Sequence, residues 1–328
     1  MKKQAINLLK YITFFAIGAF IFWLIYKDQD IEEIKEILAN DVNYLWVWVS
    51  LGLGLLSHIS RTIRWNYLVE ALGKKPRLIN TFLAVMVGYL MNMAVPRMGE
   101  ISRCGVLSKY EKITFSKLIG TVVLERLIDM LMLLLLTALI VVLQFGKVIT
   151  LLKENPDIKM QVMSKLTSPY TIAVLIILFS ALWVFRRKFK HTNLYARLHN
   201  FWTNLLEGIR TIKSMKHKGA FIFHSVFIWL MYYLMLYVVF FSFDFTTDLN
   251  PIAGLTTFVI ASYGMVAPVQ AGIGAWHFMA KESLKLYGVN NGDAVIFALV
   301  VHTSMNAMIL LVGLLSVVAL PFVNRKDS

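Results

Sequence analysis

Hydrophobic residues gather into long stretches along this chain, and polar residues collect in short segments between them. Six stretches are long enough for a helix that crosses a bilayer, which needs about 20 mostly apolar residues. They are residues 11–26, 43–60, 118–143, 169–185, 219–243 and 294–322. The first is predicted to be a retained helix and not a signal peptide, because no small-residue cleavage site follows it and Trp23 and Tyr26 are typical of an interfacial anchor. The pattern therefore predicts an all-α polytopic membrane protein.

Two further apolar stretches, residues 79–95 and 252–267, end in helix-breaking segments. The first runs into Pro96 and Gly99, and the second runs into Pro268, Gly272 and Gly274. Proline interrupts a helix because it lacks a backbone N–H group, and glycine permits backbone conformations that other residues avoid. Each stretch could be a full span or one arm of a re-entrant hairpin.

The basic residues decide between these two topologies. The chain has 33 Lys and Arg against 19 Asp and Glu, and cytoplasmic loops of membrane proteins are enriched in Lys and Arg. If all eight stretches crossed the bilayer, nine basic residues of segment 186–218 would lie outside. Six spans and two re-entrant hairpins place both termini in the cytoplasm, with 24 basic residues inside and eight outside. We therefore predict the second topology.

Under this topology, residues 1–328 form a single transmembrane domain with two halves of opposite orientation. The halves, residues 1–143 and 169–322, have the same order of elements, which is the inverted-repeat plan of many transporters. A basic amphipathic linker at 186–218 is predicted to lie on anionic headgroups, with partner binding as the alternative. A short acidic amphipathic helix is predicted over residues 28–40.

Composition agrees with a membrane protein and excludes several other classes. The chain is 58% apolar and 16% charged with a mean hydropathy of +0.66, which excludes a soluble globular or disordered protein. A single cysteine, Cys104, excludes an intramolecular disulfide framework. No HExxH, CxxC or Walker motif is present, so we expect no metal, no other cofactor and no direct use of ATP. The net charge of +14 is interpreted as orientation charge and not as a nucleic-acid footprint.

The first group of charges that stands out ends the second predicted span. Arg61 and Arg64 are three residues apart, share a helix face and precede Trp65. One interpretation is an anchor at the cytoplasmic interface, with Trp65 in the aromatic belt. The other is a pair of guanidinium groups that holds a lipid phosphate.

The second group extends from Asn92 to Arg103, around the break at Pro96. A helix that starts near Gly99 would direct its free N–H groups into a cavity and attract anions. Arg97 and Arg103 add positive charge, and Glu100 can pair with Arg103 at the i,i+3 spacing. We prefer this cavity to the alternative of a solvated cytoplasmic loop.

The third group, Glu125, Arg126 and Asp129, lies within an apolar stretch. Charged side chains at membrane depth are costly and mark ion pairs or transport pathways. Glu125 and Asp129 share a helix face, and Arg126 can partly neutralise Asp129. The alternatives are a structural ion pair and a cavity wall that faces a lipid headgroup or a coupling proton.

The second half carries milder polar groups. His277 precedes Lys281 by four residues, and His302 precedes Asn306 by four residues. Buried histidines are more often satisfied core residues than ligands, and the alternative is a titrating site.

Taken in order, these motifs resemble one family. They are Arg61-x-x-Arg64-Trp65, Pro96-Arg97-x-Gly99-Glu100-x-x-Arg103, Glu125-Arg126-x-x-Asp129, and Pro268 followed by Gly272-x-Gly274. The set is similar to the flippase-like family named for the transmembrane region of lysylphosphatidylglycerol synthase, the multiple peptide resistance factor. Two departures concern the last motif, where Ala271 replaces an expected glycine and His277 replaces an expected glutamate.

The resemblance implies a lipid transporter and not an enzyme. It would move an anionic phospholipid or a polyprenyl-phosphate-linked lipid, within a bacterial inner membrane, through a central basic cavity where the two hairpins meet. Its partners would be membrane lipids, and it would not bind nucleic acid. The chain could also form a homo-oligomer. The phosphate would be held by Arg61, Arg64, Arg97, Arg103 and Arg126, and the cavity and its charge balance would involve Asn92, Glu100, Glu125, Asp129, His277 and His302. The alternatives are an intramembrane transferase that uses Glu100, Glu125 or His277 as acid or base, and an envelope scaffold.

Overall fold

A computed structural model describes residues 18–27, 31–154, 215–267 and 269–325, together with the single residues 16, 29, 164 and 168. The predicted span 169–185, most of the basic linker 186–218 and Pro268 lie outside these residues. The chain divides into two compact units, residues 1–136 with 215–328, and residues 137–214. The described part of the second unit consists mainly of the C-terminal part of one long helix, and the candidate site lies wholly in the first unit.

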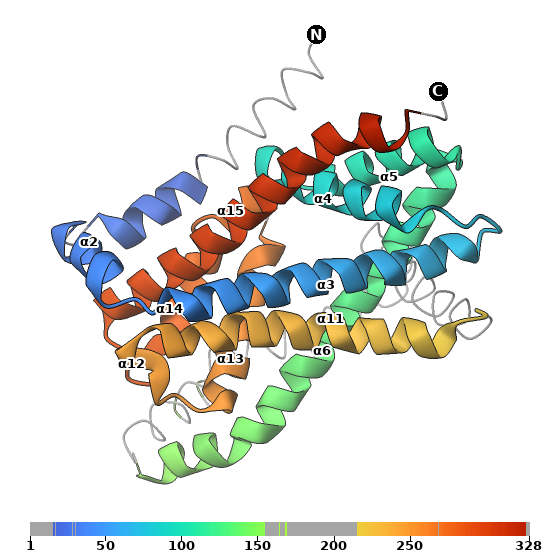
Figure 1. The fold of residues 1–328 in the computed structure, drawn as a ribbon. Coiled ribbons are helices and arrows are strands. Elements are labelled where there is room, and N and C mark those ends of the chain that lie inside the picture. Colours follow the sequence, from blue (N-terminus) through green and yellow to red (C-terminus); the bar gives the residue numbers. More distant parts are fainter. Residues whose placement is uncertain are drawn as a thin grey trace. The chain divides into compact units, whose positions relative to one another are not determined.

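Every regular element in the described ranges is helical, as the hydrophobic pattern predicts. Residues 18–26 are helical, and the elements after them are labelled in Figure 1. They are α2 (Ile31–Asn40), α3 (Tyr44–Glu70), α4 (Leu78–Ala94), α5 (Met98–Glu111), α6 (Phe115–Glu154), α11 (Lys218–Tyr237), η1 (Val238–Ser242), α12 (Asp244–Thr247), α13 (Pro251–Val266), η2 (Gln270–Gly272), α14 (Ala275–Lys285) and α15 (Asn291–Val323).

Three helices within the described ranges are long and apolar enough to cross a membrane. They cover Phe115–Phe145, Lys218–Ser242 and Asn291–Val323. A fourth span arises if the bent pair Ile34–Asn40 and Tyr44–Glu70, which meet at 85°, is taken as one. The described residues are therefore all-α and include helices that could cross a membrane, whereas six spans, two re-entrant arms and cytoplasmic termini stay predictions.

Helix α3 corrects the expected end of the second span. The sequence placed Arg61, Arg64 and Trp65 after residue 60, but α3 continues to Glu70 and buries all three side chains. The interpretation of Trp65 as an interfacial belt residue is wrong, because its side chain is fully buried. The two arginines are core groups and not orientation charges of an exposed loop.

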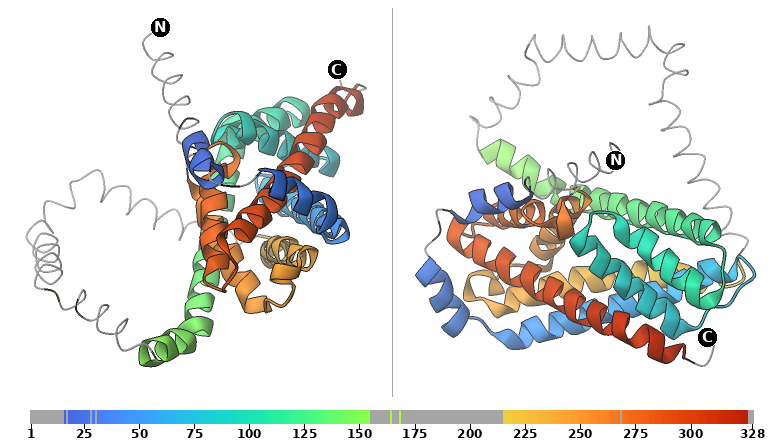
Figure 2. Two further views of the ribbon diagram at one scale, coloured as in Figure 1. Left: turned by 90° about the vertical axis from the view of Figure 1, so that its left-hand side faces the viewer. Right: turned by 90° about the horizontal axis from the view of Figure 1, so that it is seen from above.

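Helices α3 and α11 run side by side in opposite directions (Figures 1 and 2). Small residues allow their close approach: Ser50 Oγ donates a 2.7 Å hydrogen bond to the carbonyl oxygen of Met235, and Gly54 faces the Met235 sulfur. Because α11 covers one side of α3, the polar residues of α3 are closed off from the surface there.

Both proline-broken stretches form helical hairpins. Helix α4 ends at Ala94, the chain turns through Pro96, and α5 returns along α4 from Met98. In the second half, α13 and α14 pack against each other on either side of η2. The tip of this second hairpin contacts α4, so the two hairpins meet as expected, although their depth in a bilayer stays a prediction.

A glycine contact sets the spacing between α4 and α5. A Cβ atom on Gly99 would collide with the backbone oxygen of Gly88 and lie 2.6 Å from the side chain of Asn92. We expect Gly99→Ala to lower the free energy of unfolding by about 1–3 kcal/mol, because overpacking forces the two helices apart. Thermal unfolding of the purified protein measures this effect.

Gly105 provides a matched control on the same helix. A Cβ atom at this position meets no atom within 4 Å, so Gly105→Ala removes a flexible residue without a collision. We expect its stability to stay the same or to rise by up to about 1 kcal/mol. Equal losses in the two variants would contradict a close contact at Gly99.

Candidate functional site

Seven charged side chains of α3, α5 and α6 form one cluster, which is buried except at Glu100 and Arg126. It contains four arginines and three acids among the described residues, and we call these seven side chains the charge cluster: Arg61, Arg64, Glu100, Arg103, Glu125, Arg126 and Asp129. Its formal net charge is therefore +1. The cluster thus brings together residues from all three charged groups of the sequence, with the exception of Arg97.

Arg61 and Arg64 are held by acids of α6. Asp129 accepts a hydrogen bond of 2.8 Å from each of them, one on each carboxylate oxygen. Glu125 also pairs with both, with a distance of 3.3 Å from its Oε1 to Arg64 Nη2. Carboxylates are strong acceptors for guanidinium groups, so these two arginines are largely neutralised within the protein.

Arg103 and Glu100 have other partners than the expected i,i+3 pair. Arg103 Nη1 lies 3.0 Å from Glu125 Oε2, and Arg126 Nη2 lies 2.8 Å from Glu100 Oε1. The prediction that Glu100 pairs with Arg103 is therefore wrong, because α5 turns these side chains toward α6. The predicted Arg126–Asp129 pair is confirmed at 3.6 Å.

Arg103 is buried and only partly satisfied. Its guanidinium lies 4.7 Å from the ring centroid of Trp65, whose indole N–H donates a 2.9 Å hydrogen bond to Thr121. Its Nε and Nη2 atoms are buried and have no hydrogen-bond partner in the described part of the chain. Unsatisfied buried donors are costly, so these two nitrogens are candidate donors to a group that the described chain does not supply.

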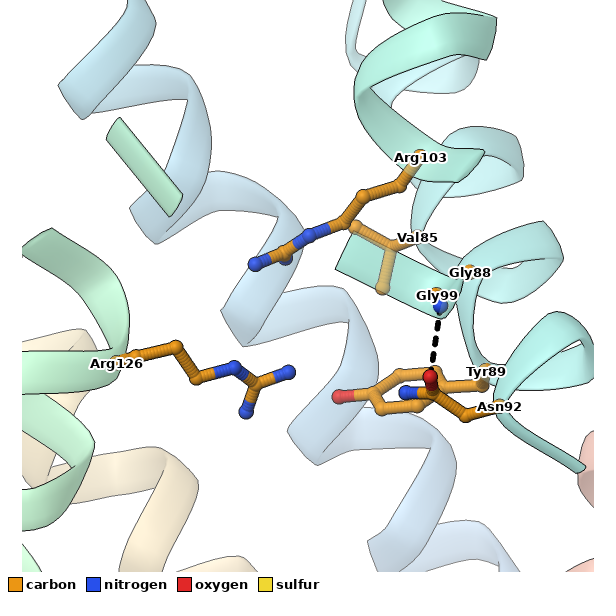
Figure 3. A pocket seen from close by; sticks show the side chains of 7 residues that line it. All are labelled: Val85, Gly88, Tyr89, Asn92, Gly99, Arg103 and Arg126. Atoms are coloured by element: carbon orange, nitrogen blue, oxygen red, sulfur yellow. Dashed lines mark hydrogen bonds between the residues drawn. The ribbon is translucent and has the colours of Figure 1, made fainter. Parts of the chain in front are cut away.

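The side chain of Arg103 lines a pocket, which Figure 3 shows. Helix α4 contributes Val85, Gly88, Tyr89 and Asn92, α5 contributes Gly99 and Arg103, and α6 contributes Arg126. The Asn92 side chain accepts a 2.7 Å hydrogen bond from the Gly99 N–H and so caps the first turn of α5. In this conformation the pocket has room for only about one water molecule.

The pocket includes Val85, Gly88 and Tyr89, which were not predicted from the sequence, beside Asn92, which was. Val85, Tyr89 and Asn92 recur at four and three residues along α4, so they share the helix face that carries Gly88. This spacing could have shown that the three side chains share a face of α4. A tyrosine within an apolar helix does not by itself indicate a binding site, because the neighbouring side chains are known only from the structure. The Tyr89 hydroxyl lies 3.3 Å from that of Tyr232 on α11, and the His58 ring lies 4.6 Å from the Tyr89 ring.

Arg97 does not join the site. It begins α5 in a left-handed conformation with φ of 65°, and it is exposed. It is neither a lining residue of this pocket nor a partner in the cluster's ion pairs. Its predicted contact with phosphate stays a prediction.

The polar residues of the second half form a separate group. The rings of His277 and His302 are buried with centroids 4.4 Å apart. One nitrogen of His302, Nε2, lies 2.8 Å from the carbonyl oxygen of Ala271, and the other, Nδ1, lies 3.0 Å from Asn306 Nδ2. Lys281 pairs with Glu282 at 3.1 Å.

The break in the second hairpin explains why glycine is expected at position 271. Ala271 adopts a left-handed conformation with φ of 49°, and Gly272 and Gly274 have φ of 76° and 80°. Alanine is disfavoured in this conformation, and the contact of its carbonyl with His302 holds it there. The predicted breaks at Gly272 and Gly274 are confirmed, whereas Pro268 lies outside the described residues.

Comparisons with known proteins identify one family and one relative. The family model described as the lysylphosphatidylglycerol synthase TM region matches residues 11–313. A UPF0104 membrane protein of Methanocaldococcus jannaschii is 29% identical over 131 residues, which are 39% of this chain and 36% of that relative. The match thus spans about a third of the relative's length. No solved structure matches.

Proposed function

Because the chain belongs to the family of the lysylphosphatidylglycerol synthase TM region, we propose that it moves an anionic lipid between the leaflets of the membrane. The lipid class is an anionic phospholipid or a polyprenyl-phosphate-linked lipid, and the membrane is the cytoplasmic membrane. The phosphate binds in the pocket between α4, α5 and α6, where Arg103 and Arg126 meet it.

The observation that carries this proposal is the pair of buried nitrogens of Arg103, Nε and Nη2, that have no hydrogen-bond partner among the described residues, on a side chain that lines the pocket. Arg126 reaches the same space from α6, and its side chain is 43% exposed and therefore accessible. A phosphate oxygen accepts hydrogen bonds from both guanidinium groups, and the N-terminus of α5 adds a favourable dipole. The cluster's net charge of +1 supports binding of an anion.

Arg61 and Arg64 support the site in a different way from the one expected from sequence. Glu125 and Asp129 hold them, so they fix the position of α6 against α3 and with it the position of Arg126. The small pocket volume implies that the hairpin of α4 and α5 moves relative to α6 when a headgroup enters. Such movement is how alternating-access carriers expose one site to two sides.

A vesicle assay tests the proposal. The purified protein is reconstituted into liposomes with phosphatidylglycerol that carries a fluorophore on one acyl chain, and dithionite destroys the label in the outer leaflet. We expect inner-leaflet label to become accessible faster than in protein-free vesicles, with labelled phosphatidylcholine moving more slowly. The assay is run with and without a proton gradient, and protein-free rates under both conditions would refute the proposal.

A further inference from the structure

We propose that Glu100 is a displaceable counter-anion of the pocket: its carboxylate holds Arg126 while the pocket is empty, and the phosphate of an entering headgroup displaces it. This inference rests on the proposed function and adds a means of regulating the same site. It assigns to Glu100 a role that differs from those of Glu125 and Asp129.

The three acids of the charge cluster differ in how firmly they are held. Glu125 and Asp129 are buried, and each contacts three arginines. Glu100 contacts Arg126 alone among the cluster's arginines, and its side chain is 26% exposed. Among these acids, Glu100 is therefore the one whose carboxylate is displaced from its arginine most easily.

The second oxygen of Glu100 strengthens this argument. Oε1 binds Arg126, but Oε2 is buried and has no hydrogen-bond partner in the described ranges. A buried carboxylate oxygen without a donor costs free energy, so this position of Glu100 is only partly satisfied. Oε2 of Glu125 also lacks a hydrogen bond, but it lies 3.0 Å from Arg103 Nη1, whereas the ion pair of Glu100 uses Oε1. A move toward solvent would relieve that cost and would free the Nη2 atom of Arg126.

The position of Glu100 resembles that of a ligand anion. It lies in the first turn of α5, where the helix dipole favours negative charge, and directly follows Gly99 in the pocket wall. A phosphate between Arg103 and Arg126 would lie close to this carboxylate, and two anions repel each other. The Nη2 atom of Arg126 therefore exchanges one anionic partner for another, while its Nη1 atom stays 3.6 Å from Asp129.

Neutralisation of Glu100 should therefore tighten anion binding. We expect Glu100→Gln to raise the affinity of the full-length protein for dihexanoyl phosphatidylglycerol about three- to tenfold, the range for a partly exposed charged partner. Binding is measured by isothermal titration calorimetry in a maltoside detergent. The gain should disappear in an Arg126→Gln background, because the displaced partner is then absent. Equal gains in both backgrounds would overturn the proposal.

A control variant and a second ligand distinguish the displacement of Glu100 from a general effect of charge and from failure of the proposed function. Glu282→Gln removes the same charge from an exposed group that pairs with Lys281 and Lys285, so its affinity should equal that of wild type. Glycerol phosphate replaces the lipid in a parallel titration, and binding as tight as that of the lipid would identify a free-phosphate site. If wild type does not bind the short-chain lipid, both proposals fail. If wild type binds and Glu100→Gln binds equally or more weakly, this inference alone fails.

Discussion

Replacing Glu125 by alanine is expected to lower the free energy of unfolding by about 3–5 kcal/mol, the cost of removing one member of a buried ion pair. The side chain is fully buried and contacts Arg61, Arg64 and Arg103. Its loss leaves three guanidinium groups in a low-dielectric interior with only Asp129 and its neighbours to balance them. Thermal unfolding of the purified variant, followed by tryptophan fluorescence, measures the loss.

Glu282→Ala is the matched control for this stability measurement. It removes an acid from an exposed ion pair on α14, where the side chains of Glu282 and Lys285 are 38% and 40% exposed. Such pairs contribute between 0 and about 1 kcal/mol, so a small shift is expected. A double variant that lacks both Glu125 and Arg61 should lose less free energy of unfolding than the sum of the two single variants. In each single variant the remaining partner is a buried charge that has lost this ion pair, and the double variant removes that charge too. Similar shifts for Glu125→Ala and Glu282→Ala would contradict a structural role for the charge cluster.

Replacing Arg126 by glutamine is expected to reduce protein-dependent transport of labelled phosphatidylglycerol about ten- to a hundredfold. Arg126 is half-exposed, lines the pocket and has a guanidinium that can form paired hydrogen bonds to phosphate. A loss of about 1.4–2.8 kcal/mol of headgroup stabilisation corresponds to this range of rates. The dithionite assay on reconstituted vesicles measures the rate directly.

Arg126→Gln should affect transport without affecting the stability of the fold. The two acids that Arg126 contacts keep other partners or solvent, so the unfolding temperature of Arg126→Gln should stay close to that of wild type. Lys109→Gln serves as control, because Lys109 lies exposed near the end of α5 and stacks on Tyr110. Wild-type transport by a well-folded Arg126→Gln protein would place the headgroup elsewhere.

Local patterns were sufficient for much of the fold. The apolar stretch 118–143 lies within α6, the stretch 79–95 coincides with α4 to within one residue at each end, and the break at Pro96 separates α4 from α5. The i,i+3 pair of Arg126 and Asp129 was also predictable, because three residues return a side chain to the same face of a helix. These features depend on neighbours within one helix.

The end of α3 and the partners of Glu100 were not predictable in this way. Arg61 and Arg64 were expected near a surface because charge at membrane depth is costly, but carboxylates from α6 offset that cost. Glu100 was expected to bind Arg103 within α5 and instead binds Arg126 on another helix. In each case the ion-pair partner is a side chain of another helix, so it depends on how segments distant in the sequence pack together.

The sequence by itself thus determined the membrane class, the helical elements, the two glycine-containing breaks and the identity of the charged residues, because hydropathy and helix periodicity are local properties. Only the tertiary structure decided which acids pair with which arginines. The packing of α3, α5 and α6 places Glu125 and Asp129 against Arg61 and Arg64. Among the described residues it leaves Nε and Nη2 of Arg103, which lines the pocket, without a hydrogen bond. The pairing of Asp129 with Arg61 and Arg64 depends on distances of about 3 Å between residues more than sixty positions apart in the chain, where electrostatic and hydrogen-bond energies change steeply with separation.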